Sequence, residues 1–384
     1  MGYFFKLLFI ISAVITLASC KKDPSIPVVA IPKTSTVNDS IWVLDSTVTL
    51  DRKILLASNS FGTQLYLLGN NYLVTIDSTT HTTSSTLVSA SDIGVFSKPV
   101  LTPLFYSYLS SNDSTVVVGL NQFPNVSVSI NVLDSDTNIH FICSNSTTGP
   151  LVAINDLNQL IIPVQLSANA DNTPTYQAFA IYNINASIGS SSLSVSFKGV
   201  IQNLMDTVSA WQGHGHAEPP FVFVQAMDDN FYYSSVYQGI TYKIDVSGNF
   251  TKLFNGELLN FVYVNDTLNA LGSYSPLTGN YYSELQWFMN YPATNVWIEY
   301  NFNISPDYRT GYAVVQNKVI AYRLGQIWEV VINKSTSSVQ FKELDNSTIS
   351  TNYINSVIAF DNKVYVTTID GLFYKPINKF FTYK

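Results

Sequence analysis

Short strands separated by Asn- or Asp-containing turns recur along the chain, and this recurrence constrains the fold more than any other feature. Asn317-Lys318-Val319 is followed by Gly325, and 45 residues after its first residue Asn362-Lys363-Val364 is followed by Gly371. A third unit begins at Asp229-Asn230-Phe231. Each unit combines an apolar strand, a polar turn, a second strand and a glycine that opens a third strand bearing an aromatic residue. Weaker units of the same kind begin at Asn38, Asn70, Asn112, Asp156 and Asn265.

This pattern predicts an all-β protein, because long stretches with helical periodicity are scarce. Units of about 40 to 50 residues with about four strands each are typical of β-propeller blades. One four-stranded sheet cannot cover both of its faces, whereas blades packed around an axis cover one another. The unevenly spaced units allow six to eight blades, and we expect seven, with the last strands near Phe380 completing the sheet of the first blade. Tandem β-sandwich domains are the alternative, because strand spacing alone does not distinguish the two folds.

The first nineteen residues have the three parts of a secretory signal: a start with Lys6, an apolar stretch over residues 7–17, and small residues before Cys20. The apolar stretch is shorter than the about 20 helical residues that a bilayer core requires. Leu17-Ala18-Ser19-Cys20 resembles the lipobox of bacterial lipoproteins. That resemblance implies cleavage before Cys20, diacylglycerol on its thiol and acylation of the new amino terminus. An ordinary secretory peptide that happens to contain a cysteine is the alternative.

The residues after Cys20 predict a spacer between the membrane and a folded domain. Pro24, Pro27 and Pro32 favour an extended chain. We therefore expect a signal peptide at 1–19, a lipidated tether at 20–36 and the propeller at 37–384. Lys21-Lys22-Asp23-Pro24 resembles the start of many Bacteroidetes lipoproteins, which implies anchoring in the outer membrane. In that group an acidic run after the cysteine accompanies surface display; here that run is reduced to Asp23, so the side of the membrane is left open.

A second feature resembles exported proteins of the same group, which carry O-glycans at Asp-Ser/Thr followed by an aliphatic residue, Ala, Met or Thr. Chance would supply only about one or two such triplets. Asp-Ser/Thr is also ordinary turn chemistry. The residues that the resemblance implies as glycosylated are Ser40, Ser46, Ser78, Ser114, Thr207 and Thr267.

Charge excludes one class of partner. The formal net charge of −7 becomes about −8 when Lys6 leaves with the signal, and nucleic acid would require a basic surface. Only 12% of the residues are charged, so the surface is largely neutral and polar, which suits an exported β protein. We expect the partners to be the membrane, through the lipid, and a glycan, peptide or envelope protein.

Two segments contain the residue types of metal sites. In an extended segment His214, His216 and Glu218 would face the same way and could ligate a divalent transition metal, although the neighbouring glycines and prolines favour a loop. Asp134, Asp136 and Asn138 resemble the opening of a calcium loop. Ile139 stands where the turn glycine of that loop belongs, which favours a polar hairpin turn. No other cofactor is expected.

An aromatic tract near residue 290 is a candidate ligand-binding surface. Exposed rings would stack on sugars or on a partner's side chains, whereas rings packed between blades would be part of the core. The tract contains Tyr281, Tyr282, Trp287, Tyr291 and Trp297.

The sequence favours a non-catalytic recognition or scaffold module over an enzyme. It contains no G-x-S-x-G elbow, no phosphate loop, no H-E-x-x-H and no C-x-x-C. A metal-assisted hydrolase or lyase centred on His214, His216 and Glu218 is the second hypothesis, since propeller enzymes gather their residues from distant blades.

Overall fold

The structure is a computed structural model, which describes most of the chain after residue 40. Chain contacts divide the protein into Met1–Asn38 and Asp39–Lys384. The described residues all belong to the second unit, and they are 41–48, 55–70, 72–88, 99–110, 115–131, 139–141, 152–167, 174–187, 189, 191–207, 222–235, 240–255, 257–264, 267–273, 285–291, 296–302 and 310–384.

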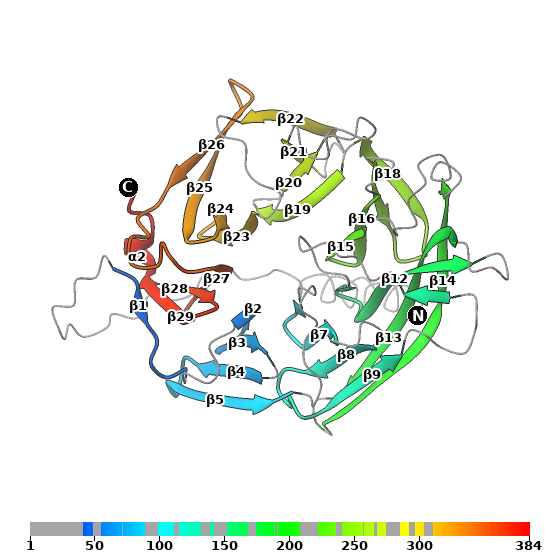
Figure 1. Cartoon of the computed structure of the whole chain (residues 1–384), viewed down its shortest axis with the longest axis horizontal. Helices are drawn as coiled ribbons and strands as arrows, with labels where there is room; N and C mark the ends of the chain where they lie inside the picture. Colours follow the sequence, from blue (N-terminus) through cyan, green and yellow to red (C-terminus); the bar gives the residue numbers. More distant parts are fainter. Residues whose placement is uncertain are drawn as a thin grey trace, which may run out of the picture. The chain divides into compact units, whose positions relative to one another are not determined.

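The second unit is a six-bladed β-propeller, whose blades are six hydrogen-bonded sheets. Figure 1 shows the sheets following one another in chain order around a common centre. The first sheet contains β2 (Leu55–Phe61), β3 (Gln64–Gly69), β4 (Tyr72–Asp77) and β5 (Thr82–Leu87). The second contains β6 (Val100–Leu101), β7 (Phe105–Leu109), β8 (Thr115–Leu120) and β9 (Ser127–Asn131).

The third sheet has five strands and the fourth has four. The third contains β10 (Ile139–Phe141), β11 (Ala153–Ile154), β12 (Gln159–Ser167), β13 (Pro174–Ser187) and β14 (Ser192–Thr207). The fourth contains β15 (Val222–Met227), β16 (Asn230–Ser235), β17 (Ile240–Ile244) and β18 (Phe250–Asn255). In the third sheet β14 is the last strand and pairs with β13.

The fifth sheet has eight strands and is made of two antiparallel meanders. The first meander contains β19 (Glu257–Val264), β20 (Thr267–Ser273), β21 (Leu285–Tyr291) and β22 (Val296–Phe302). The second contains β23 (Gly311–Val315), β24 (Lys318–Arg323), β25 (Gln326–Asn333) and β26 (Ser338–Glu343). A short parallel pairing of β22 with β26, Asn301 with Ser338 and Phe302 with Val339, joins them into one sheet.

The expectation of seven blades is therefore wrong, and six falls at the lower end of the predicted range. Turn-and-strand units in a sequence mark antiparallel meanders, but they do not show whether the outer strands of two meanders pair with each other. Here the parallel pairing of β22 with β26 joins two meanders into one sheet, so the number of separate sheets is six. The alternative of tandem β-sandwiches is also not what the chain forms.

The last sheet is completed by the first strand of the domain. It contains β27 (Ile354–Phe360), β28 (Lys363–Thr368), β29 (Gly371–Pro376) and, beside β29, β1 (Val43–Leu44). The buried ring of Trp42 packs edge-on against Phe380 of helix α2 (Ile377–Phe380), with ring centroids 6.0 Å apart. The sequence led us to expect that the last strands would complete the first sheet. Instead, the early strand β1 completes the last sheet, and Phe380 lies in a helix.

The hydrophobic core lies between neighbouring sheets. Phe105 and Val118 of the second sheet pack in one buried cluster with Leu160 and Ile162 of the third. Four further clusters lie between neighbouring sheets in the same way. A sixth cluster packs the two meanders of the fifth sheet together, with Tyr312, Val319 and Val339 against Val262 and Val264. Because the sheet that contains β7 and β8 is covered on both faces, these two strands are buried along almost their whole length.

Two sheets contain the same close contact between a tyrosine ring and a glycine on the next strand. Tyr106 of β7 is paired with Gly119 of β8, and a Cβ atom on Gly119 would lie 2.0 Å from the tyrosine ring. Tyr322 of β24 is paired with Gly311 of β23, where a Cβ atom would lie 2.4 Å from the ring. A ring that covers a glycine in this way packs a strand position that has no side chain of its own.

Within the part of the chain given above, no helix is long and apolar enough to cross a membrane.

Candidate functional site

Most of the site residues predicted from the sequence lie outside the described residues. These are Cys20, Ser40, Ser114, Asp134, Asp136, Asn138, His214, His216, Glu218, Tyr281 and Tyr282. The predictions of a lipid anchor, a transition-metal site and a calcium loop therefore stay predictions. Among the described residues, no three His, Cys, Asp or Glu side chains are grouped so as to hold a metal ion.

The backbone of the aromatic tract is described in part. Trp287 and Tyr291 lie in β21 and Trp297 lies in β22. The two strands are paired, with Asn290 opposite Trp297. The fold thus brings three of the five predicted aromatic residues onto neighbouring strands of the eight-stranded sheet.

The six predicted glycosylation residues occupy different environments. Ser46 is exposed in the turn after β1, Ser78 is half-buried after β4, and Thr267 is buried, at 7% exposure, at the start of β20. Thr207 is the last residue of β14, and Ser40 and Ser114 lie outside the described residues.

Two of these Asp-Ser-Thr triplets form turns through the aspartate. The Asp45 carboxylate accepts the backbone N–H of Thr47 at 3.0 Å. The Asp77 carboxylate accepts the N–H groups of Thr79 and Thr80 at 2.8 and 2.9 Å. The hydrogen bond from the Thr80 backbone is the main cause that lowers the pKa of Asp77.

A pocket of about 220 Å³ lies between the third and fourth sheets, and we call it the β14 pocket. It is open on one side, and strand β14 and the turn between β17 and β18 form opposite walls. The residues that line it are Gln159, Ile181, Lys198, Gly199, Val200, Ile201, Phe231, Ile244, Asp245, Val246, Ser247 and Gly248.

The floor of the β14 pocket is apolar because it is the edge of the core between these sheets. Ile181, Phe231 and Ile244 are 6%, 3% and 1% exposed, and they belong to one hydrophobic cluster together with half-buried Ile201. In the same cluster Phe179 packs on Tyr233, with ring centroids 4.6 Å apart. The floor is thus held by core packing and does not depend on a ligand to form.

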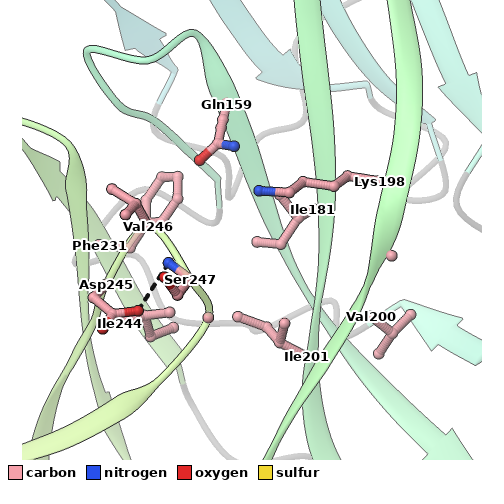
Figure 2. A pocket seen from close by; sticks show the side chains of 12 residues that line it. Gln159, Ile181, Lys198, Val200, Ile201, Phe231, Ile244, Asp245, Val246 and Ser247 are labelled. Carbon is pink, nitrogen blue, oxygen red and sulfur yellow. Dashed lines mark hydrogen bonds between the residues drawn. The ribbon is translucent and has the colours of Figure 1, made fainter.

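Lys198 owes its position to a β-bulge. Along β13 and β14, Tyr182 is paired with Phe197 and the preceding Ile181 with Gly199, so Lys198 has no residue opposite it. An extra residue of this kind re-aims side chains, and bulges are frequent beside binding and catalytic sites. Figure 2 shows the Lys198 amine pointing from β14 into the pocket, on the same side as Gln159 and across from Asp245 and Ser247.

Lys198 is exposed and forms no ion pair with the residues described around it. Its amine is therefore a charged group at the rim of an apolar cavity. This combination of an apolar floor with a small number of placed polar groups is typical of ligand sites.

Asp245 has a structural role in the opposite wall. Its carboxylate accepts the backbone N–H groups of Ser247 and Asn249, each at 2.9 Å, and the Asn249 side-chain amide at 3.0 Å. The hydrogen bond from the Asn249 side chain is the largest of the causes that lower the pKa of Asp245, which keeps the carboxyl group ionised. The turn between β17 and β18 is thereby fixed in shape.

Gly248 brings this turn against the floor. Its φ of 85° is one that L side chains rarely adopt, and a Cβ atom there would lie 3.0 Å from Cγ2 of Ile201. Gly248 and Ile201 both line the pocket, so their close approach brings the turn into contact with the β14 wall.

Lys198 and its pocket were not among the sites predicted from the sequence. A signal was present: Leu193, Val195 and Phe197 alternate with serines, and the alternation changes phase at Lys198-Gly199, after which Val200 and Ile201 follow directly. A glycine inside a strand pattern together with a phase change indicates a bulge.

Comparisons with known proteins identify the fold and no family. No protein-family model matches the sequence, and no curated protein matches it. A solved structure of a streptogramin B lyase is similar, with 9% identity and a TM-score of 0.50 over 88% of this chain and 99% of that chain. A catalytically inactive virginiamycin B lyase from Staphylococcus aureus, solved with quinupristin, has 9% identity and a TM-score of 0.51 over 87% and 98% of the two chains.

A third similar structure, BamB from Moraxella catarrhalis, has 12% identity and a TM-score of 0.41 over 82% of this chain and 79% of that chain. The two lyases support the propeller fold. At such low identities the similarity extends to the fold alone, and the chemistry of those proteins is not carried over to this chain.

Proposed function

We propose that this protein is an envelope lipoprotein whose propeller binds a ligand at the β14 pocket. The ligand is a glycan, a peptide or a protein. The observation that carries the binding part is the bulge at Lys198, which places an exposed amine over a preformed apolar floor. The residues lining this pocket include no histidine or cysteine, and the carboxylate of Asp245 is engaged by its own turn. These features support binding over catalysis at this site.

The anchor is supported by the amino-terminal sequence. Residues 1–19 have the order of a secretory signal, and Cys20 stands at the lipobox position. Lipid on Cys20 would hold the domain at a membrane, because each buried methylene adds about 0.8 kcal/mol and several acyl chains add their contributions. The proline-containing residues 20–36 would separate the propeller, 37–384, from that surface.

Two measurements test the anchor. In cells supplied with labelled palmitate, the wild-type chain should become labelled and fractionate with the outer membrane, and Cys20→Ser should lose both properties. Retention of label in Cys20→Ser would contradict the proposal. Protease accessibility of the domain in intact cells then determines which side of the membrane it faces.

Binding is tested with Lys198→Met in the full chain, purified in detergent, against panels of envelope glycans and of peptides. Lys252 is an exposed lysine on neighbouring β18 that does not line the pocket, so Lys252→Met is the matched control. One class of ligand should bind at least about fivefold more weakly to Lys198→Met, as expected for loss of a charge-assisted hydrogen bond, and equally to Lys252→Met. Absence of binding in every class, or binding insensitive to Lys198, would refute the proposal.

The second hypothesis from the sequence, a metal-assisted hydrolase or lyase, depends on His214, His216 and Glu218, which lie outside the described residues. Stoichiometric metal in the purified chain that is lost in His214→Ala would support it. Substoichiometric metal that is unchanged in that variant would remove its basis.

A further inference from the structure

The floor of the β14 pocket selects against sugars. Ile181, Ile201, Phe231 and Ile244 offer no hydrogen-bonding group to a ligand in contact with them. A hydroxyl group buried there would lose its water without gaining a partner, which is unfavourable. The group that enters must therefore be apolar.

The volume of the pocket limits how much of a ligand can enter. Pockets that enclose a whole drug-sized molecule are about 300 to 1,000 Å³, whereas this one is about 220 Å³. It suits one side chain or a group of similar size. The rest of the ligand must lie along the rim.

The rim includes the backbone of a sheet edge. Gly199 has no side chain, and the side chain of Val200 packs in the cluster between the second and third sheets, so both residues line the pocket through the strand's own backbone. Among the described residues, β14 pairs with β13 on one side and is the edge strand of its sheet on the other. An edge strand of this kind can accept a further strand, which is a common mode of peptide recognition.

The charged side chains on the two walls of the pocket determine how a bound group is oriented. Lys198 provides a cation beside the floor, and the ionised carboxylate of Asp245 lies across the pocket. An anion is attracted to the Lys198 side and repelled from the Asp245 side. In the last residue of a peptide, the carboxylate and the side chain are attached to the same Cα atom, so an apolar side chain on the floor leaves the carboxylate beside the rim.

We infer that the β14 pocket captures the carboxyl-terminal residue of a peptide whose last side chain is apolar, with the terminal carboxylate on the Lys198 amine and the peptide backbone along the edge of β14. This inference rests on the proposed binding function and names its ligand class. Capture of a terminal carboxylate beside an added strand is a known form of peptide recognition.

The test uses the full chain in detergent and fluorescein-labelled Gly-Ser-Gly-Ser-Leu, followed by fluorescence anisotropy. The same peptide with a carboxyl-terminal amide keeps the side chain and removes the charge. The free acid should bind about tenfold more tightly than the amide, as loss of a charge-assisted hydrogen bond implies. Lys198→Met should weaken the acid to the level of the amide and leave the amide unchanged. Lys198→Arg and the control Lys252→Met should retain the preference for the acid.

Direct binding of decanoate and of a chitin oligosaccharide, measured by isothermal titration calorimetry, separates this inference from the proposed function. If either binds in a Lys198-dependent manner and neither peptide does, the peptide inference is overturned and the pocket is still a binding site. If acid and amide bind equally well to the wild type, the inference is likewise overturned. If the peptides, decanoate and the oligosaccharide all fail to bind, or if none of their binding depends on Lys198, the proposed function at this pocket fails as well.

Discussion

Replacing Gly119 with alanine should strongly destabilise the propeller, because the new methyl group would occupy the place of the Tyr106 ring. A Cβ atom at this position would lie 2.0 Å from Cζ of Tyr106 and 2.1 Å from its hydroxyl oxygen. Carbon atoms in contact are normally about 3.5 Å or more apart, so the end of the ring would have to move by about 1.5 Å. Tyr106 is fully buried, and protein interiors are close-packed, so the ring would have to displace its neighbours.

The displacement would also break the hydrogen bonds of the tyrosine. The Tyr106 hydroxyl donates to the carbonyl of Pro124 at 2.7 Å, and the carbonyl of Val88 lies 3.2 Å from it. Overpacking of a core costs about 1–3 kcal/mol, and each lost hydrogen bond costs about 1 kcal/mol. We therefore expect Gly119→Ala to lower the free energy of unfolding by about 3–5 kcal/mol.

Equilibrium unfolding in guanidinium chloride, followed by tryptophan fluorescence, measures this loss. Gly189→Ala is the matched control, since a Cβ atom on Gly189 would have nothing within 4 Å and should change stability little. In a Tyr106→Leu background the ring is gone, and Gly119→Ala should cost less than about 1 kcal/mol. Wild-type stability of Gly119→Ala, or an undiminished cost in the Tyr106→Leu background, would refute the steric argument.

Three further substitutions test the closure of the propeller and the wall of the pocket. Trp42→Ala should cost about 3–5 kcal/mol, because it removes a buried ring that packs on Phe380, and guanidinium unfolding measures the loss. Burial lowers the pKa of the fully buried Lys375, so the unfolded chain binds its proton more tightly and wild-type stability should rise relative to Lys375→Met as the pH approaches 10.5; a pH-independent difference would contradict this. Gly248→Ala should cost about 1–3 kcal/mol through backbone strain and contact with Ile201, and a wild-type midpoint of unfolding would show that this glycine is not needed.

The turns of the propeller were predictable because they depend on local chemistry. Gln316 and Asn317, between β23 and β24, have φ values of 51° and 59°, and Asp361 and Asn362, between β27 and β28, have φ values of 46° and 58°. Two consecutive residues with positive φ form the hairpin turn that asparagine and aspartate favour. The predicted units at 317 and 362 are therefore confirmed as hairpins of this type.

The closure of the ring and the number of blades were not predictable from such patterns. Val43 and Leu44 pair with strand β29, more than 300 residues later in the chain, and two residues in each strand are too few to leave a periodic pattern. The parallel pairing of β22 with β26 involves two residues on each strand as well. Both features depend on tertiary contacts between distant segments, and local sequence carries little information about them.

The candidate site was missed for a related reason. Residue types that stand out in a sequence, such as the histidines near 214, do not line the β14 pocket. It is made from one lysine, two glycines, a few common polar residues and ordinary apolar residues. What distinguishes Lys198 is the bulge that removes its cross-strand partner. The phase change at Lys198-Gly199 marks the bulge, but only the pairing of β13 with β14 shows that the amine is turned toward the neighbouring sheet.

The position of this pocket also determines which substitutions can separate binding from folding. The propeller is held together between its sheets, and the floor of the pocket is part of one such junction. Ile181, Phe231 and Ile244 are buried there, so shortening any of them would open a cavity in the core as well as change the binding surface. Lys198 is exposed and belongs to the rim, so its replacement alters charge without removing core contacts. Because the unfolding of Lys198→Met should match that of the wild type, a loss of binding in this variant would be a property of the site itself.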